Sequence, residues 1–133
     1  MMKNRSIPAS TVIPVLAYAD VSVAAEWLCR AFGFVERLRI ADHRAQLTFG
    51  DGAVVVAGGG DRPGGHSTMV RVTDVDAHCG RARQAGTKIV APPTDHPYGE
   101  RQYTAEDIGG HRWTFTESIA DVDPADWGGV LCL

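Results

Sequence analysis

Paired cysteines, clustered charge and long apolar runs are all lacking in this chain of 133 residues. Its three cysteines, Cys29, Cys79 and Cys132, are odd in number and form no C-x-x-C pair. The sequence therefore predicts neither a disulfide framework nor a zinc knuckle, and the cytoplasm is the expected location.

No apolar stretch approaches the roughly 20 residues that a membrane-spanning helix requires, and no signal-peptide core follows the charged start of the chain. The net charge is −3, and the 13 basic residues are scattered rather than gathered on one face. We therefore expect a soluble, unexported protein that binds neither nucleic acid nor a membrane.

An internal repeat is present instead. Two apolar, strand-like runs, at 12–18 and 67–72, each end in an Asp-Val junction that begins a helical pattern, and Asp20 and Asp74 lie 54 positions apart. Asp20 or Ser22 is the expected N-cap of the first helix, and Asp74 or Asp76 that of the second. A repeat of this length indicates two copies of one supersecondary unit, neither of which buries its apolar face alone.

The remaining patterns complete each copy. After a helix that ends at Gly33, the first copy has expected strands at 34–40, 44–49 and 53–57; the second has a helix at 75–85 and strands at 87–91, 101–105 and 111–117. We expect Pro92-Pro93 to break the chain before a loop through His96. Each half is therefore β-α-β-β-β, and the expected fold class is α+β.

These elements imply one domain with two modules. The expected boundaries are a flexible lead at 1–10, a single domain at 11–118 and an irregular tail at 119–133. Inside the domain, module one spans about 11–58, a glycine-rich connector 59–66, and module two about 67–118.

Two stretches of the second half resemble the vicinal oxygen chelate superfamily, the glyoxalase, bleomycin-resistance and dioxygenase-like proteins. They are Tyr98-Gly99-Glu100-Arg101 and the segment 107–115, which looks like the D-x-x-G-H-x-W-x-F strand of that group. The likeness extends from Val12 to Glu117. It implies that the two βαβββ modules form a cupped, partly open mixed β-barrel around a cavity, and that two chains form a homodimer.

The resemblance also implies four positions where metal-dependent members carry a ligand, one on the first and last strand of each module. Alignment on the Asp junctions and the glycine turns places them at Ile13, Val56, Ser67 and Thr114. None offers the imidazole or carboxylate that divalent metals prefer, so we expect no metal and no other cofactor. His66 lies beside Ser67, but only a β-bulge would turn it into the cavity.

The four positions implied by the resemblance, the alternation along their strands and the loop before the last hairpin together give an expected ligand-binding set. The residues are Ile13, Val54, Val56, Ser67, Met69, Arg71, Tyr98, Arg101, Tyr103 and Thr114. The apolar members are expected in the middle of the cup, and the arginines and tyrosines at its edge. An arginine there would bind a carboxylate, phosphate or sulfate; the alternative is an ion pair with a nearby glutamate such as Glu100.

By resemblance, the favoured function is a small-molecule binding protein of the bleomycin-resistance type, a branch associated with antibiotic resistance, which sequesters an amphipathic ligand without metal. No catalytic residue is expected in that case. The alternative is an enzyme of the same fold, a lyase, isomerase or dioxygenase, with a displaced metal or none. Trp127 in the tail either anchors a partner or folds back on the domain or across a dimer.

Overall fold

The computed structural model describes residues 2–59, 66–108 and 111–132, and within them nine strands form one mixed sheet. The strands are β1 Val12–Ala17, β2 Val35–Ile40, β3 Arg44–Phe49, β4 Gly52–Ala57, β5 Ser67–Arg71, β6 Lys88–His96, β7 Glu100–Glu106, β8 Arg112–Ser118 and β9 Gly129–Leu131. The helices are α1 Val21–Phe32, α2 Val75–Gln84 and the short 3-10 helix η1 Pro124–Trp127. Most of the expected connector and the glycine turn at 109–110 lie outside the described residues.

The strand order is β6-β7-β8-β5-β1-β4-β3-β2-β9, so the sheet stays open between its two edges, β6 and β9. Strands β1 and β4 are parallel, as are β5 and β8, and the antiparallel pair of β1 with β5 joins the modules. This arrangement confirms the predicted α+β fold of two βαβββ modules.

Asp20 and Asp74 are the N-caps of the two long helices. Each side chain accepts a hydrogen bond of 3.0 Å from the backbone N–H three residues further on. Gly33 ends α1 with φ of 81°, a left-handed conformation that glycine adopts without steric cost. Within the described ranges, no helix is long and apolar enough to cross a membrane.

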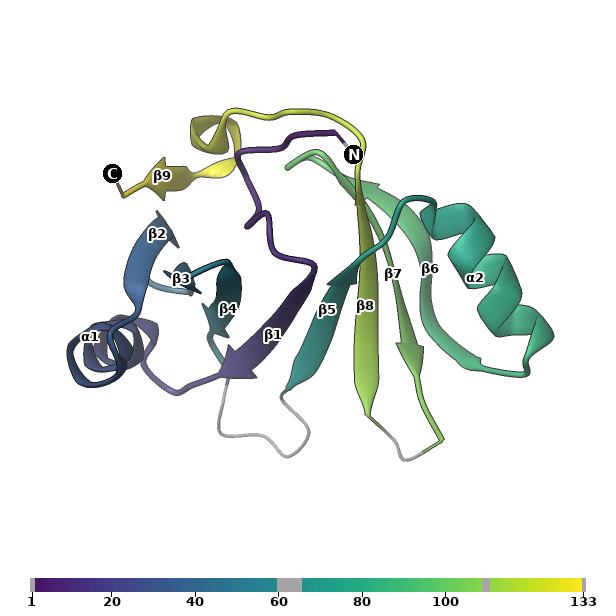
Figure 1. Ribbon diagram of the computed structural model, residues 1–133, viewed down its shortest axis with the longest axis horizontal. Coiled ribbons are helices and arrows are strands. Elements are labelled where there is room, and N and C mark those ends of the chain that lie inside the picture. The colour runs from purple at the N-terminus through teal and green to yellow at the C-terminus, as the bar shows by residue number, and fades with distance from the viewer. Residues whose placement is uncertain (1, 60–65, 109–110, 133) are drawn as a thin grey trace.

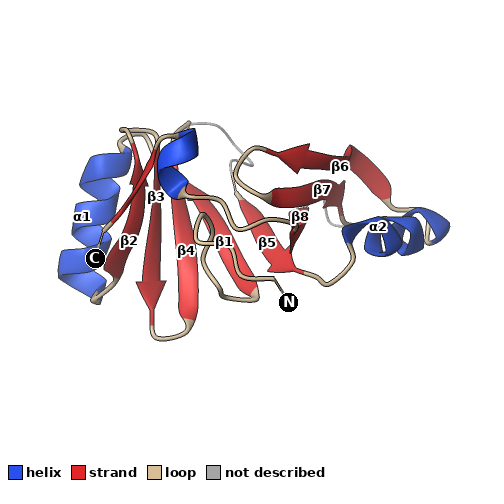
Figure 2. Cartoon of the chain, turned by 90° about the horizontal axis from the view of Figure 1, so that it is seen from above, coloured by secondary structure: helices blue, strands red, loops and turns tan. Residues whose placement is uncertain are grey.

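Both long helices pack against the same face of the sheet, near its opposite ends (Figures 1 and 2). The cluster under α1 contains Val21, Ala25, Leu28, Ala45, Leu47 and Val56. The cluster under α2 contains Val75, Cys79, Tyr103 and Ala105. A third cluster contains Ile7, Ile13, Ala53, Val55 and Met69, and it lies on the other face, which we call the inner face.

Strand β6 differs from the expectation that Pro92-Pro93 would end it. The strand continues to His96, and its register against β7 shifts between Ala91 and Thr94. A bulge on an edge strand is where prolines are tolerated, because their missing N–H groups need no partner there. The expected loop is therefore mostly strand, and only a short turn precedes β7.

Residues 2–10 and 119–132, which include the predicted flexible lead and irregular tail, make specific contacts with the rest of the domain. Ser6 and Ile7 are buried, and Asn4 donates a hydrogen bond to Oε2 of Glu100 at 2.8 Å. In the tail, η1 is followed by β9, which pairs with β2 at the sheet edge. The segment before β1 and the segment after β8 run along the top of Figure 1. They are in contact, because Ser6 Oγ donates a hydrogen bond to the Val122 carbonyl.

Candidate functional site

The inner face has an apolar centre built by the strands that join the modules. Ile13 lies opposite Met69 in the β1–β5 ladder, and Met69 lies beside Thr114 in the β5–β8 ladder. Ser67 lies on the same face, opposite Val15. Ile13, Ser67, Met69 and Thr114 therefore occupy the face on which the sequence placed them.

Val54 and Val56 do not face the cup, and their predicted orientation is wrong. Val56 is fully buried under α1, with Val54 packed against the same cluster, and Val55 lies on the inner face. The cause is the length of the two turns. Two residues separate the paired ends of β3 and β4, whereas residues 107–111 separate those of β7 and β8, so aligning the glycine turns shifted the register by one.

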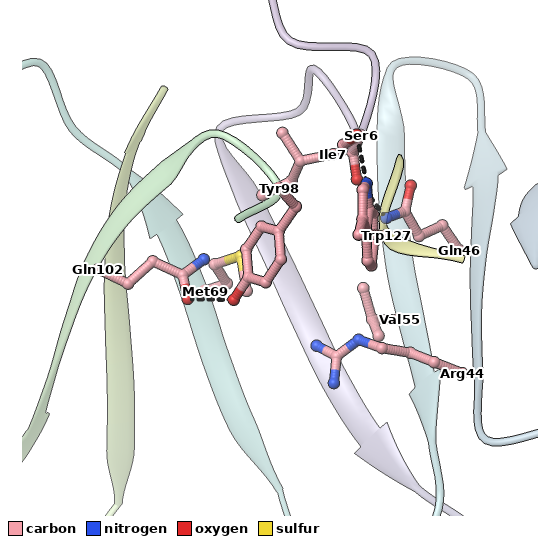
Figure 3. A pocket seen from close by; sticks show the side chains of 9 residues that line it. All are labelled: Ser6, Ile7, Arg44, Gln46, Val55, Met69, Tyr98, Gln102 and Trp127. Atoms are coloured by element: carbon pink, nitrogen blue, oxygen red, sulfur yellow. Dashed lines mark hydrogen bonds between the residues drawn. The ribbon is translucent and has the colours of Figure 1, made fainter. Parts of the chain in front are cut away.

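Two adjoining compartments open on the inner face. The first has a volume of about 140 Å³ and is lined partly by Ser6, Ile7, Gln46, Val55 and Trp127 (Figure 3). The second has a volume of about 360 Å³ and extends over Val15, Ser67, Thr114 and the bulged end of β6. Four side chains line both compartments: Arg44, Met69, Tyr98 and Gln102.

Tyr98 is the centre of an aromatic group over these compartments. Its ring stacks on His96, with centroids 5.1 Å apart and planes 7° apart, and lies at 46° to Trp127 with centroids 5.0 Å apart. The backbone carbonyl of Tyr98 accepts a hydrogen bond of 2.7 Å from Asn4. The predicted site residue Tyr98 is thus fixed from both of its sides, because the chain start and the tail both contact it.

Arg44 supplies positive charge to the same space. Its guanidinium points into the cavity, below the rings of Tyr98 and Trp127 in the view of Figure 3. Among the described residues, no carboxylate lies within ion-pair distance of Arg44. Both residues are half-buried, and this burial lowers the pKa of Arg44 and raises that of Tyr98.

Arg71 faces inward as predicted, but its hydrogen bonds are used within the protein. It is buried, donates to Ser118 and to the carbonyl of Pro8, and lies 3.8 Å from Glu100. Glu100 in turn is fully buried and accepts hydrogen bonds from Thr116, Ser118 and Asn4. Of the two predicted roles, Arg71 therefore has the ion pair with a glutamate rather than a free guanidinium for a ligand. Its hydrogen bond to Pro8 also connects the start of the chain to the sheet.

Arg101 and Tyr103 lie on the helix-covered face, because odd-numbered residues of β7 point away from the cup. Arg101 pairs with Asp95 at 2.6 Å and with Asp76 of α2 at 3.1 Å. The Tyr103 hydroxyl lies 2.5 Å from Nδ1 of His78 on α2. The structure does not bring these two residues to the inner face.

Trp127 folds back on its own domain. Its Nε1 donates a hydrogen bond of 2.6 Å to Oγ of Ser6, and its ring closes one side of the first compartment. Of the predicted alternatives, Trp127 therefore packs on its own domain and is not an exposed anchor for a partner.

Because Val55, and not Val56, faces inward, it takes the second of the four positions equivalent to the family's metal ligands. The four positions are therefore Ile13, Val55, Ser67 and Thr114. None carries an imidazole or a carboxylate. Across the described ranges, no group of three or more His, Cys, Asp or Glu side chains is placed to hold a metal ion. His66 is exposed, and its Nδ1 accepts a long hydrogen bond of 3.4 Å from the Ala17 backbone.

Sequence reasoning missed Arg44, Gln46 and Gln102. Strand β3 alternates polar and apolar residues, and its apolar Ala45 and Leu47 pack under α1, so period two places Arg44 and Gln46 on the opposite face. The same alternation in β7 places Gln102 beside the inward Thr116, to which its amide donates a hydrogen bond. The signal was present in both strands.

Several solved structures are similar to this chain. A glyoxalase/bleomycin resistance protein/dioxygenase superfamily member from Vibrio splendidus 12B01 is 18% identical, with 80% of this chain and 97% of that chain covered and a TM-score of 0.63. Methylmalonyl-CoA epimerase from Mycobacterium tuberculosis is 19% identical, with 91% and 96% covered and a TM-score of 0.66. TioX from Micromonospora sp. ML1 is 39% identical, with 83% and 99% covered and a TM-score of 0.38.

Among curated proteins, none matches this sequence. The sequence does match a family model over residues 11–115, which is nearly the whole of both modules. Together with the open sheet of two βαβββ units, this match shows that the chain belongs to the Glyoxalase/Bleomycin resistance protein/Dioxygenase superfamily.

Proposed function

We propose that this protein binds and sequesters a small amphipathic molecule on its inner face, without a metal ion. The apolar part of the ligand lies against Tyr98 and Trp127, and an anionic group binds Arg44. The role that the sequence gave to Arg71 and Arg101 thus passes to Arg44.

The observation that carries this proposal is the isolation of the Arg44 guanidinium. A cation that is partly removed from water, with no carboxylate among the described residues to pair with it, favours an anionic ligand. Arg71 shows the contrast, because its charge is already offset by Glu100. The aliphatic and hydroxyl side chains at the four metal-ligand positions support binding rather than metal chemistry.

The aromatic rings near Arg44 determine which apolar part of a ligand fits. Tyr98 and Trp127 offer broad apolar surfaces at an angle to one another, and Met69 and Val55 line the cavity with them. Pockets that bind small molecules typically combine such apolar walls with a few polar groups. A planar ring system with one acidic substituent fits this combination.

The test uses two dyes with one scaffold. We expect 8-anilinonaphthalene-1-sulfonate to bind saturably and N-phenyl-1-naphthylamine, which lacks the sulfonate, to bind more weakly. Substitution R44Q should weaken sulfonate binding roughly 10- to 100-fold, since a charge-assisted hydrogen bond contributes roughly 1.5–3 kcal/mol, and leave the neutral dye nearly unchanged.

The matched control is R81Q, because Arg81 is an exposed arginine on α2, away from both compartments. It should leave the binding of both dyes unchanged. If R44Q bound the sulfonate as tightly as the unsubstituted protein, or lost both dyes equally while circular dichroism showed a folded chain, the assignment of Arg44 would be wrong.

The homodimer stays a prediction, and an exposed apolar patch supports it. Trp27 and Phe32 at the end of α1 contact each other edge to face, and Phe49 of β3 adjoins Gly33. All three aromatic side chains are about half exposed. Patches of this kind commonly mark interfaces, so light scattering at micromolar concentration should give twice the mass of one chain, and W27E should lower it to one.

A further inference from the structure

A separate pocket of about 370 Å³ lies on the helix-covered face of the sheet, beneath α2. Its walls are apolar, formed by Val70, Ala82, Ala105, Trp113 and Phe115. No residue of this α2 pocket lines either compartment of the inner face, since the sheet separates them. The proposed function does not use it.

The internal repeat explains why space exists there. Counted from their capping aspartates, α1 and α2 correspond at an offset of 54, which pairs Leu28 with Ala82. Leu28 is 8% exposed and fills the space between α1 and the sheet. At the same place α2 has only a methyl group, and removing a leucine side chain from such a position leaves a cavity that its surroundings only partly close.

The walls of the α2 pocket are held in place by contacts of their own. Phe115 stacks on Tyr103 with ring centroids 5.1 Å apart, and it lies against the tilted ring of His78 with centroids 4.1 Å apart. Trp113 is fixed by a hydrogen bond of 3.0 Å from its Nε1 to the Asp107 carboxylate. A preformed pocket keeps its shape when empty, so a ligand does not have to order it.

The titratable groups around the α2 pocket already have partners. His78 and Tyr103 are hydrogen-bonded to each other, and Glu106 forms an ion pair of 3.0 Å with Lys88. Asp107 accepts from Trp113. A charged ligand would have to displace one of these partners, so the lining favours a neutral molecule.

We propose that the α2 pocket is a second binding site, which takes a neutral, monocyclic or small bicyclic aromatic molecule. Its volume exceeds that of the roughly 150 Å³ apolar cavities that bind benzene in engineered proteins. The aromatic walls provide edge-to-face and stacking contacts for such a ring. The first module thus has a packed core at Leu28, and the second has a binding pocket at the equivalent Ala82.

Fluorobenzene is the probe, followed by ¹⁹F NMR. The unsubstituted protein should give a saturable change in the fluorine shift and linewidth. Substitution A82L restores the side chain that α1 carries, so it should weaken binding at least tenfold and raise the melting temperature. A77L adds the same atoms at an exposed position of α2 and should bind fluorobenzene as the unsubstituted protein does.

Two further measurements keep this site distinct from the inner face. Binding of 8-anilinonaphthalene-1-sulfonate should be the same in A82L as in the unsubstituted protein, and saturating amounts of that dye should not displace fluorobenzene. Displacement by the dye, an unchanged affinity in A82L, or no saturable shift at all would each overturn the proposal. If A82L failed to fold, A82V would give the same comparison with a smaller side chain.

Discussion

The hydroxyl of Tyr98 donates a hydrogen bond of 3.1 Å to Oε1 of Gln102, and both side chains line the two compartments of the inner face. The ring is therefore a wall shared by two spaces rather than the end of one. Removing it would join them.

We predict that Y98A binds larger ligands relative to small ones. The ratio of affinities for the doubled dye bis-anilinonaphthalene sulfonate and for its single-ring-system parent should rise several-fold, because the joined space admits both halves. Y98F keeps the ring and loses only the bond to Gln102, so its ratio should stay near that of the unsubstituted protein. Fluorescence titration measures both. An unchanged ratio in Y98A would show that the compartments are not divided by this ring.

A second prediction concerns Gly99, which turns the chain between Tyr98 and β7. It has φ of +85°, and a Cβ there would lie 2.5 Å from the carbonyl oxygen of Ala120. Gly86 has nearly the same φ, with nothing within 4 Å of such a Cβ. G86A should therefore cost about 1 kcal/mol of unfolding free energy from backbone strain alone, and G99A roughly 3 kcal/mol or more. Urea denaturation measures the difference, and equal costs would contradict the close contact.

The third prediction concerns the buried network around Glu100. Substitution E100A leaves the Arg71 guanidinium, 3.8 Å away, buried without its carboxylate. Breaking such a pair from one side costs about 3–5 kcal/mol. E106A removes a glutamate whose partner, Lys88, is largely exposed, and should cost less than about 1 kcal/mol. Chemical denaturation compares the two variants, and similar losses would mean that Arg71 finds another partner.

The fourth prediction concerns pH. Burial raises the pKa of Tyr103 to about 12, with a further contribution from Cys79. Because the unfolded chain ionises its tyrosines near pH 10, the stability that Tyr103 contributes is complete below that pH and lost as pH rises toward 12. Absorbance at 295 nm should show one tyrosine ionising near pH 12, and Y103F should lack that step. A midpoint near 10 would contradict the burial.

The sequence was informative where local chemistry decides structure. Asp20 and Asp74, each one of two expected N-caps, cap their helices, and Gly33 ends α1 as expected, because each of these effects acts within a few residues. The inward position of Ile13 was implied by the family resemblance, and strand alternation then gave the inward orientation of Met69. The helix caps needed only the repeat and the residue types at its junctions, whereas the inner face also needed the resemblance.

The features that the sequence did not predict depend on contacts between residues far apart in the chain. The orientation of Val54 and Val56 depended on the length of a hairpin turn in the other module, which is visible only in the paired ladders. Trp127 closes the first compartment because it meets Ser6, which no local pattern indicates. Composition alone does not separate Arg44 from Arg71, since partners distant in sequence decide which charge is already offset.

The hydrogen bond between Ser6 and Trp127 spans 121 residues, nearly the full length of the chain. Chains are synthesised from the N-terminus at roughly 5–20 residues per second, so the first segment waits several seconds before its distant partner exists. Contacts this remote in sequence also form slowly, because the intervening chain must first be organised. The first compartment of the inner face can therefore be completed only after residue 127 has been synthesised, because Trp127 forms part of its wall.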